Sequence, residues 1–183
     1  MRNFLIQFRS STLTSSVGFP ETRRSGAIPQ VDRCGRFKSV IIGPWFYDSG
    51  AKDVLGVTVD KDIVLHGHSC FGRENNSYTV SLKIKDANGN FCVVPKAGTF
   101  SSKLLQYKDG SYYGFEVLFD SATELKKNTK YQIEALISGP PCWKGKEGFS
   151  TAHCSGMTFT FCGSHPRRMD QKIGQFPEFL FSA

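Results

Sequence analysis

Short runs in which apolar and polar residues alternate are the feature that most constrains the fold of this chain. In "YTVSLKIKD", the residues Tyr78, Val80, Leu82 and Ile84 share one face of an extended strand, and the polar residues between them share the other. This is the pattern of a half-buried antiparallel strand, with one face on a core and one in water.

The same period of two recurs along the chain from Phe37 onward. Three further segments, "YYGFEVLF", "YQIEALI" and "MTFTF", align their apolar residues on one face: Tyr113, Phe115, Val117 and Phe119; Tyr131, Ile133, Ala135 and Ile137; Met157, Phe159 and Phe161. Strands are also predicted over Val54–Val59, Ile63–Ser69, Thr99–Leu105 and Glu178–Phe181. Asn88-Gly89 predicts a hairpin turn that leads into a strand at "FCVV".

Turn residues separate these predicted strands, and no segment of ten or more residues carries a convincing helical stripe. About ten short strands in one chain of 183 residues predict an all-β fold, an antiparallel β-sandwich. We expect this domain to cover residues 34–183.

Residues 1–33 have a different composition and form a separate segment. They are rich in Ser, Thr and Arg, poor in acids, and show no sustained period. These are the marks of a flexible basic tail and equally of a mitochondrial transit peptide. We expect a flexible tail on a cytoplasmic protein, with mitochondrial targeting as the alternative. No apolar run approaches the ~20 residues of a membrane span, so no membrane association is expected.

The formal net charge of +7 is concentrated at the N-terminal end. Residues 1–36 hold six arginines against Glu21 and Asp32, whereas the rest of the chain has only isolated basic pairs such as Lys126-Lys127. A nucleic-acid-binding domain usually gathers basic residues on one face. The distribution therefore argues against nucleic acid as a partner.

Six cysteines occur, at positions 34, 70, 92, 142, 154 and 162, with no C-x-x-C pair among them. We find no signal peptide ahead of them. These observations favour free thiols in a reducing compartment. A secreted, adhesive β-sandwich is the alternative, and it predicts disulfides.

"HGHSCFG" places three potential metal ligands, His66, His68 and Cys70, at every second position. On a regular strand such residues point the same way, about 6.6 Å apart. A full site needs three or four ligands, and His153, Cys154 and His165 are possible distant partners without a spaced pair. The alternation fits an ordinary strand equally well. We predict no metal and no cofactor, and keep a metal-dependent enzyme as an alternative.

Catalytic motifs are not apparent in the sequence. There is no G-x-S-x-G, no P-loop and no G-x-G-x-x-G between a strand and a helix, and the acids are scattered. The segment "GPPCWKGKEG", residues 139–148, is glycine-rich but lacks the helix that would hold a phosphate. We therefore expect no enzyme. Trp143 in this predicted loop is either an anchor for a protein partner or a plug for the end of the sandwich.

From about Arg36 to Ala183, the chain resembles the PHR domain, in the version found in BTB-domain cullin adaptors. The resemblance rests on the order and spacing of several pieces: "RF" at Arg36-Phe37, "GPWFYDSG", "DVLGVTVDKDIVLHGHSCFG", "YTVSLKI", "FEVLFDSATELKKNTKYQIEALISGPPCWKGKEG", "GMTFTFC" and "GQFPEFLF". At the glycine corner, Gly67, Phe71 and Gly72 are kept, whereas His66, His68 and Cys70 depart from the family's pattern.

This resemblance implies an antiparallel sandwich of about eleven strands with exposed apical loops and no catalytic residues. It also implies a monomeric module that recognises a substrate or partner protein for a ubiquitin-ligase assembly. We expect the partner-binding residues to be Phe71 and Arg73 at the corner, and Pro141, Trp143, Lys144 and Lys146 in the predicted loop. Phe71 and Trp143 would supply apolar anchors, and the three cations would steer an acidic partner. Gly67 and Gly72 are expected to serve the backbone.

Overall fold

The computed structural model describes residues 30–47, 52–93, 95–107, 110–163 and 172–183. Within these ranges the chain is built from strands, and no helix long and apolar enough to cross a membrane is present. The strands are β1 Asp32–Gly35, β2 Phe37–Trp45, β3 Lys52–Val59, β4 Ile63–Phe71, β5 Ser77–Lys85, β6 Lys96–Ser101, β7 Lys103–Tyr107, β8 Gly110–Leu125, β9 Tyr131–Ser138, β10 Cys142–Gly148, β11 Thr151–Cys154, β12 Met157–Gly163, β13 Ile173–Gly174 and β14 Glu178–Ser182.

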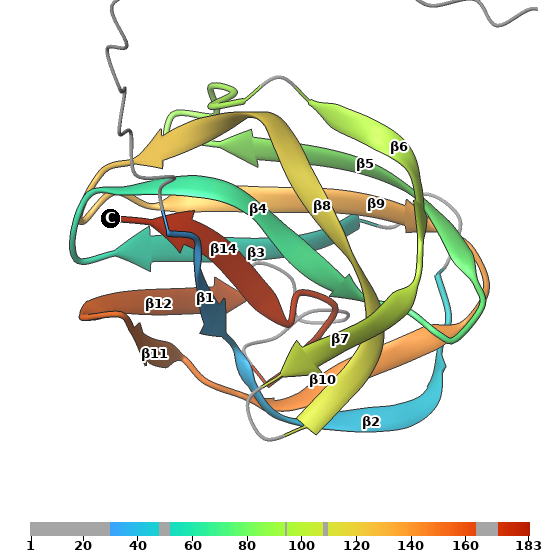
Figure 1. Ribbon diagram of the computed structural model, residues 1–183. Coiled ribbons are helices and arrows are strands. Elements are labelled where there is room, and N and C mark those ends of the chain that lie inside the picture. The colour runs from blue at the N-terminus through green and yellow to red at the C-terminus, as the bar shows by residue number, and fades with distance from the viewer. Residues whose placement is uncertain (1–29, 48–51, 94, 108–109, 164–171) are drawn as a thin grey trace, which may run out of the picture.

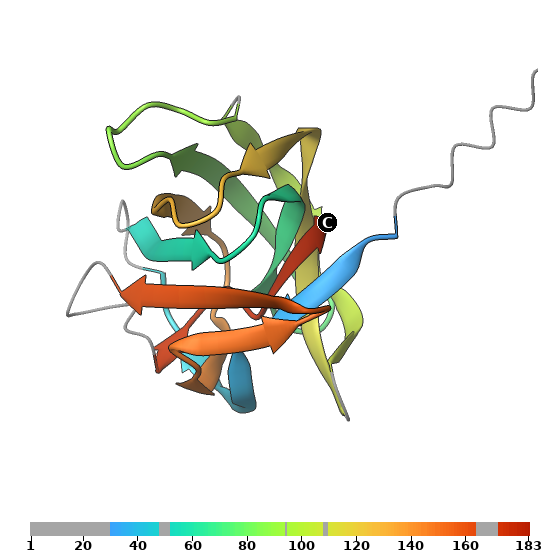
Figure 2. The same cartoon turned by 90° about the vertical axis from the view of Figure 1, so that its left-hand side faces the viewer.

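These strands form three antiparallel sheets. A five-stranded sheet has the order β1-β14-β4-β8-β7, a six-stranded sheet has the order β11-β12-β3-β9-β5-β6, and a three-stranded sheet has the order β13-β10-β2. In Figure 1 the five-stranded sheet lies in front of the six-stranded one, and β2 and β10 lie at the lower end. Figure 2 shows the two larger sheets from the side, with β8 and β14 on the right. The predicted all-β sandwich is confirmed.

Alternation in the sequence decides which side chains fill the space between the sheets. Tyr78, Val80, Leu82 and Ile84 of β5 are all wholly buried. The aligned apolar residues of β9 and β12 are buried in the same core cluster. Burial of such side chains from water is the main force that holds the two sheets together.

Three local predictions were wrong. The single strand predicted over Thr99–Leu105 is two strands, because the chain leaves the six-stranded sheet after Ser101 and enters the five-stranded one at Lys103. The turn at Asn88-Gly89 forms, with Gly89 at a φ of 84°. The strand predicted to follow it is reduced in the described residues to one bridge between Phe91 and Lys85.

The third wrong prediction concerns β8. Tyr113 was expected on the buried face, but Tyr112 is the wholly buried residue. Alternation breaks at Gly114, which is buried next to the equally buried Phe115. A Cβ at Gly114 would lie 2.5 Å from the backbone oxygen of Cys70, so β8 passes too close to β4 there for any side chain. The buried face therefore shifts by one residue across this glycine.

The N-terminal segment predicted over residues 1–33 lies almost wholly outside the described residues. Its last residues, Asp32 and Arg33, begin β1 and pair with Phe181 and Leu180 of β14. The edge strand β1 therefore spans the predicted boundary, with Asp32 and Arg33 on one side of it and Cys34 and Gly35 on the other.

A disulfide joins Cys34 of β1 to Cys154 of β11, across the open side of the sandwich. The prediction of six free thiols was therefore wrong for this pair, whereas Cys70, Cys92, Cys142 and Cys162 are free. The two cysteines are 120 residues apart in sequence, but their Cα atoms lie 5.4 Å apart. Only the folded arrangement of the sheets brings them together.

Candidate functional site

The histidines of "HGHSCFG" point to opposite sides of β4. The pairing of β4 with β14 and with β8 shifts register between Leu65 and Gly67, which marks an irregularity at His66. The His66 side chain is half-exposed, and its Nε2 lies 2.9 Å from the hydroxyl of Ser182. His68 and Cys70 are wholly buried on the other side. The described residues contain no group of three or more side chains placed to hold a metal.

His68 is packed as a neutral core residue. Its ring lies 4.7 Å from that of Phe176, and its Nδ1 lies 3.7 Å from the Cys70 sulfur. Complete burial lowers the pKa of His68 to about 4, because a charged imidazolium would be cut off from water. Burial also raises the pKa of the Cys70 thiol. Both side chains are uncharged at neutral pH.

Phe71, predicted as an exposed anchor, is wholly buried at the end of β4. Its ring packs edge-on against Tyr112 at 5.0 Å and lies 5.8 Å from Phe37. These residues belong to a small second cluster, which also contains Leu105 and Tyr107. The prediction that Phe71 is accessible to a partner was therefore wrong, since the preceding irregularity and the packed corner turn it inward.

Gly67 and Gly72 are required by close approaches of the backbone. A Cβ at Gly67 would lie 2.4 Å from the backbone oxygen of Val117. A Cβ at Gly72 would lie 2.4 Å from the hydroxyl of Ser102. Neither position has room for a side chain, which agrees with the expected backbone role of these glycines.

The segment predicted as a long loop at 139–148 is mostly strand β10. It pairs with β2 on one side and β13 on the other, and Trp143 is half-buried. The Trp143 ring packs edge-on against Tyr113 at 5.5 Å and contacts the second cluster. Trp143 is thus partly a packing residue and partly a surface residue.

The corner and β10 meet at one backbone hydrogen bond, in which the Trp143 N–H donates to the Gly72 oxygen at 3.1 Å. This contact brings Arg73, Pro141 and Trp143 together. They line one wall of a hollow of about 310 Å³, and Ile42, Gly43 and Pro44 of β2 line the other.

A second hollow, of about 400 Å³, adjoins the first. It is lined by Lys38, Ser39, Val40 and Ile42 of β2, Tyr107 of β7, Gly110 and Ser111 of β8, and Trp143. The two hollows share Ile42 and Trp143, and Ile42 is 76% exposed. We call the two hollows together the Trp143 groove. An exposed isoleucine beside a half-buried tryptophan is typical of a protein-binding surface.

The predicted lysines lie beside the groove rather than in it. The Lys144 ammonium sits 4.9 Å above the ring of Trp45, a cation–π contact. Lys146 and Lys38 are exposed, and both lie within 4 Å of the Glu147 carboxylate. Neither hollow has an acidic residue in its described lining, whereas Lys38 and Arg73 line one hollow each. The lining of the groove therefore combines apolar side chains with two cations, of which Lys38 also faces Glu147.

Cys142 lies at the floor of the first hollow but is chemically quiet. Its sulfur lies 2.8 Å from the Tyr47 hydroxyl and 3.3 Å from the Gln175 side-chain oxygen. Burial raises the pKa of the thiol to about 12, so it remains protonated at neutral pH. The Gln175 amide in turn donates to the Trp143 oxygen at 2.9 Å, which fixes the start of β10.

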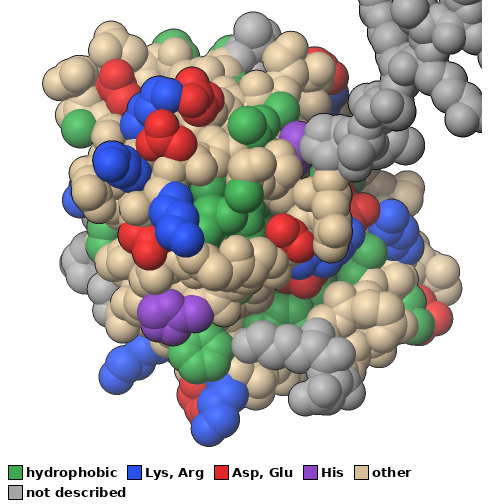
Figure 3. All heavy atoms as spheres, turned by 60° about the vertical axis from the view of Figure 1, so that its left-hand side comes forward, with side chains coloured by type: hydrophobic (Ala, Val, Ile, Leu, Met, Phe, Trp, Pro, Cys, Tyr) green, Lys and Arg blue, Asp and Glu red, His purple; other side chains and the backbone are tan. Residues whose placement is uncertain are grey.

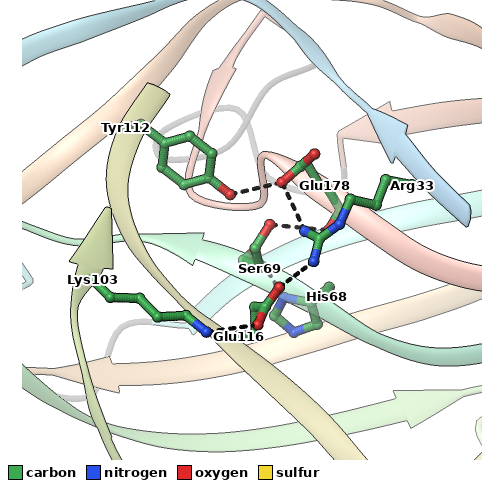
Figure 4. A network of polar contacts seen from close by, with 7 residues as sticks. All are labelled: Arg33, His68, Ser69, Lys103, Tyr112, Glu116 and Glu178. Atoms are coloured by element: carbon green, nitrogen blue, oxygen red, sulfur yellow. Dashed lines mark hydrogen bonds and ion pairs between the residues drawn. The ribbon is translucent and has the colours of Figure 1, made fainter. Parts of the chain in front are cut away.

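A network of charged side chains crosses the outer face of the five-stranded sheet (Figure 4). Arg33 pairs with Glu116 and, at 3.3 Å, with Glu178, while Lys103 also binds Glu116. The Tyr112 hydroxyl donates to Glu178 at 2.9 Å. Each carboxylate is already bound by a cation of another strand, so the network ties β1, β14, β8 and β7 together. Burial raises the pKa of Glu178 despite these partners.

Charges are balanced elsewhere on the surface as well. A third hollow, which includes His66 and Leu118, is lined by Arg33 together with Glu116 and Asp120. On the face seen in Figure 3, basic and acidic side chains lie beside one another, with small hydrophobic areas between them. The Trp143 groove differs from the third hollow in that no acidic residue lines it.

Sequence reasoning missed the β2 half of the groove. Val40, Ile42 and Pro44 come from "SVIIGPWF", in which apolar residues do not alternate with polar ones. Ile42 and Phe46 are 76% and 62% exposed. An apolar run that lacks alternation and contains Gly-Pro was the available signal for a sheet edge with exposed apolar side chains.

The described residues form an all-β sandwich whose surface carries the Trp143 groove. In a comparison with known families, the model of the PHR domain matches residues 35–182. The chain belongs to the PHR domain family.

Similar proteins have been described in several vertebrates. The chain is 30% identical over 170 residues to BTB/POZ domain-containing protein 6-B of Danio rerio, covering 90% of this chain and 33% of that protein. It is 28% identical over 172 residues to human BTB/POZ domain-containing protein 3, covering 90% and 31%. The chain thus spans about a third of the length of these relatives.

Proposed function

We propose that this chain is a non-catalytic protein-recognition domain that binds a substrate or partner protein of a ubiquitin-ligase assembly through the Trp143 groove. The observation that carries the proposal is the groove itself, where exposed Ile42 and half-buried Trp143 separate two hollows free of acidic residues. Membership of the PHR family and similarity to BTB/POZ domain-containing proteins support it. We further propose that the domain is monomeric and acts in the cytoplasm, while the Cys34–Cys154 disulfide is the feature that the secreted alternative predicts.

Each expected residue then has a defined role. Trp143 and Ile42 supply apolar contact at the centre of the groove, where buried contacts contribute most to affinity. Arg73 lines the first hollow, and Lys146 lies exposed at the rim, where they accelerate the approach of an acidic partner. Lys144 acts through its contact with Trp45, beside the start of β10. Phe71 supports the groove from the core.

The test is affinity capture of the whole chain from cells, read by quantitative mass spectrometry. Wild-type bait is compared with Trp143→Ala and with Phe91→Ala, a matched control that removes an aromatic ring 57% exposed on a different sheet. We expect a defined set of proteins, including ubiquitin-ligase components, to be lost with Trp143→Ala and kept with Phe91→Ala. An identical set with all three baits would contradict the proposal.

A metal-dependent enzyme remains the competing hypothesis from another class. It requires a bound ion, so elemental analysis of the purified chain provides the decisive measurement. One equivalent of a transition metal that is lost in His68→Gln would support the competing hypothesis over ours.

A further inference from the structure

The free edge of β2 is the longest sheet edge in the described part of the chain. β2 ends the three-stranded sheet and has nine residues. The strands at the other edges, β1, β7, β11, β6 and β13, have two to six residues. A strand edge carries backbone N–H and C=O groups that can pair with a further strand.

The Tyr107 side chain shows to which side of β2 the backbone N–H and C=O groups of Phe37 point. The Phe37 N–H donates to the Tyr107 hydroxyl at 2.8 Å, and the same hydroxyl donates to the Phe37 oxygen. Both groups of Phe37 therefore point away from β10. In an antiparallel strand the N–H and C=O of one residue point to the same side, and successive residues alternate.

It follows that Ser39 and Ile41 also direct their backbone groups away from β10. The pairing of β2 with β10 is regular from Phe37 to Ile41, and its shift lies beyond that point. Neither residue makes a described backbone hydrogen bond outside the sheet ladder. The Tyr107 hydroxyl thus occupies the first position of an edge whose next positions are open.

The second hollow of the Trp143 groove borders this edge. The second hollow lies between β2 and the facing end of β7 and β8. At about 3.3 Å per residue, the regular stretch from Ser39 to Ile41 offers roughly 10 Å to an extended segment. The register shift that follows Ile41 ends this regular stretch.

The chemistry of the groove specifies its occupant. Ile42 and Trp143 present apolar surface, and Arg73 and Lys38 present positive charge, although Lys38 also lies 3.7 Å from the Glu147 carboxylate. We propose that an extended, acidic segment of a partner protein adds to β2 as a further strand, pairs with Ser39 and Ile41, and sets apolar side chains against Ile42 and Trp143. This mode of recognition rests on the proposed function and names the form and charge of the partner segment.

The test begins with a display library of random 12-residue peptides selected on the whole chain. We expect the recovered peptides to be acidic with apolar residues at alternate positions. Fluorescence polarisation then measures their affinity for the wild-type chain and for Ser39→Pro, Trp143→Ala and Phe91→Ala. Ser39→Pro removes an N–H that points away from β10, so the sheet ladder remains intact.

We expect Ser39→Pro and Trp143→Ala each to weaken binding at least tenfold, and Phe91→Ala to leave it unchanged. A second test leaves the protein unchanged. Each peptide is made in two N-methylated forms, one methylated at the odd residues and one at the even residues. The form whose methylated nitrogens face β2 should lose binding, and the other form should keep it. This difference between the two methylated forms can be measured even if Ser39→Pro fails to fold.

Several outcomes overturn strand addition. In one outcome, Trp143→Ala weakens binding, whereas Ser39→Pro and both methylated peptide forms bind normally. The groove then still recognises a partner, but not by pairing with β2. If none of these changes matters, both proposals fail. Recovery of no peptides, or of neutral or basic ones, also contradicts the inference.

Two other occupants are separated in the same experiment. Dimerisation that is abolished by Ser39→Pro would assign the edge to a second copy of the chain. Peptide binding seen only after removal of residues 1–29 would assign it to the chain's own N-terminal segment. Either result overturns the proposal.

Discussion

The centre of β4 and the ribbon formed by β2 and β10 are both made of unusual sequence, yet they differ in every physical respect. "HGHSCFG" contributes His68, Cys70 and Phe71, all wholly buried, to a strand with neighbours on both edges. The ribbon has one free edge and exposes Ile42 beside Trp143. The comparison shows that reactive residue types indicate function only when their strand leaves them accessible.

This difference in burial predicts that, among the variants considered, substitution of Phe71 lowers the free energy of unfolding most. Truncating a wholly buried aromatic ring leaves a cavity, so Phe71→Ala should lower the free energy of unfolding by about 4 kcal/mol. Trp143→Ala should lower it by less than half as much, because Trp143 is only half-buried. Urea denaturation of both variants gives the two values. Equal losses would show that the ribbon is as much core as β4 is.

A smaller loss is expected when the Cys34–Cys154 disulfide is removed. Cys154→Ser should lower the free energy of unfolding by about 3 kcal/mol without reductant, the typical loss when a disulfide that constrains the unfolded chain is removed. With reductant, wild type and variant should become nearly equal. Thiol titration of the unfolded wild-type chain should find four thiols before reduction and six after it. Six before reduction would contradict the disulfide.

Acid should act on β4 through His68. Its pKa falls from 6.5 to about 4 on folding, so the unfolded state takes up a proton first as pH decreases. The stability from neutral His68 is complete above pH 6.5, and about 2 kcal/mol is lost at pH 5. His68→Gln should lack this part of the pH dependence between pH 7 and 5. Parallel stability curves for the two proteins would mean that His68 is hydrated in the folded state.

The smallest effect on stability is expected at Lys146, in the exposed part of the ribbon. Lys146→Ala should change the free energy of unfolding by less than about 0.5 kcal/mol, as surface substitutions usually do. It should slow the association of an acidic partner a few-fold, and the effect should disappear at high salt. Stopped-flow binding at two salt concentrations measures this. A salt-independent change would indicate that Lys146 contacts the bound partner directly.

Much of the fold could be predicted from alternation, because a half-buried strand must place its apolar residues on one face. Tyr78 to Ile84 follow this rule along their whole length, and Tyr131, Ile133, Ala135 and Ile137 follow it in β9, where Leu136 lies on the other face. The rule failed where geometry depends on another part of the chain. The break at Ser102 depends on which sheet receives β7, and the shift at Gly114 depends on the approach of β4.

The candidate site was predictable only in part, for the same reason. The sequence singled out Arg73, Pro141 and Trp143, and the structure places all three in the lining of one hollow. The opposing wall from β2 could not be derived from local pattern, because strand order fixes which edge is left open. The disulfide was equally hidden, since nothing local connects Cys34 with Cys154.

The double hydrogen bond between Phe37 and the Tyr107 hydroxyl also bears on the solubility of the protein. Together with the register shift after Ile41, it confines the regular open edge of β2 to three residues, Ser39 to Ile41. Fibril-forming cross-β segments commonly need six or seven residues of uninterrupted pairing. An edge bounded in this way is long enough to hold one short segment and too short to nucleate a growing stack of identical chains.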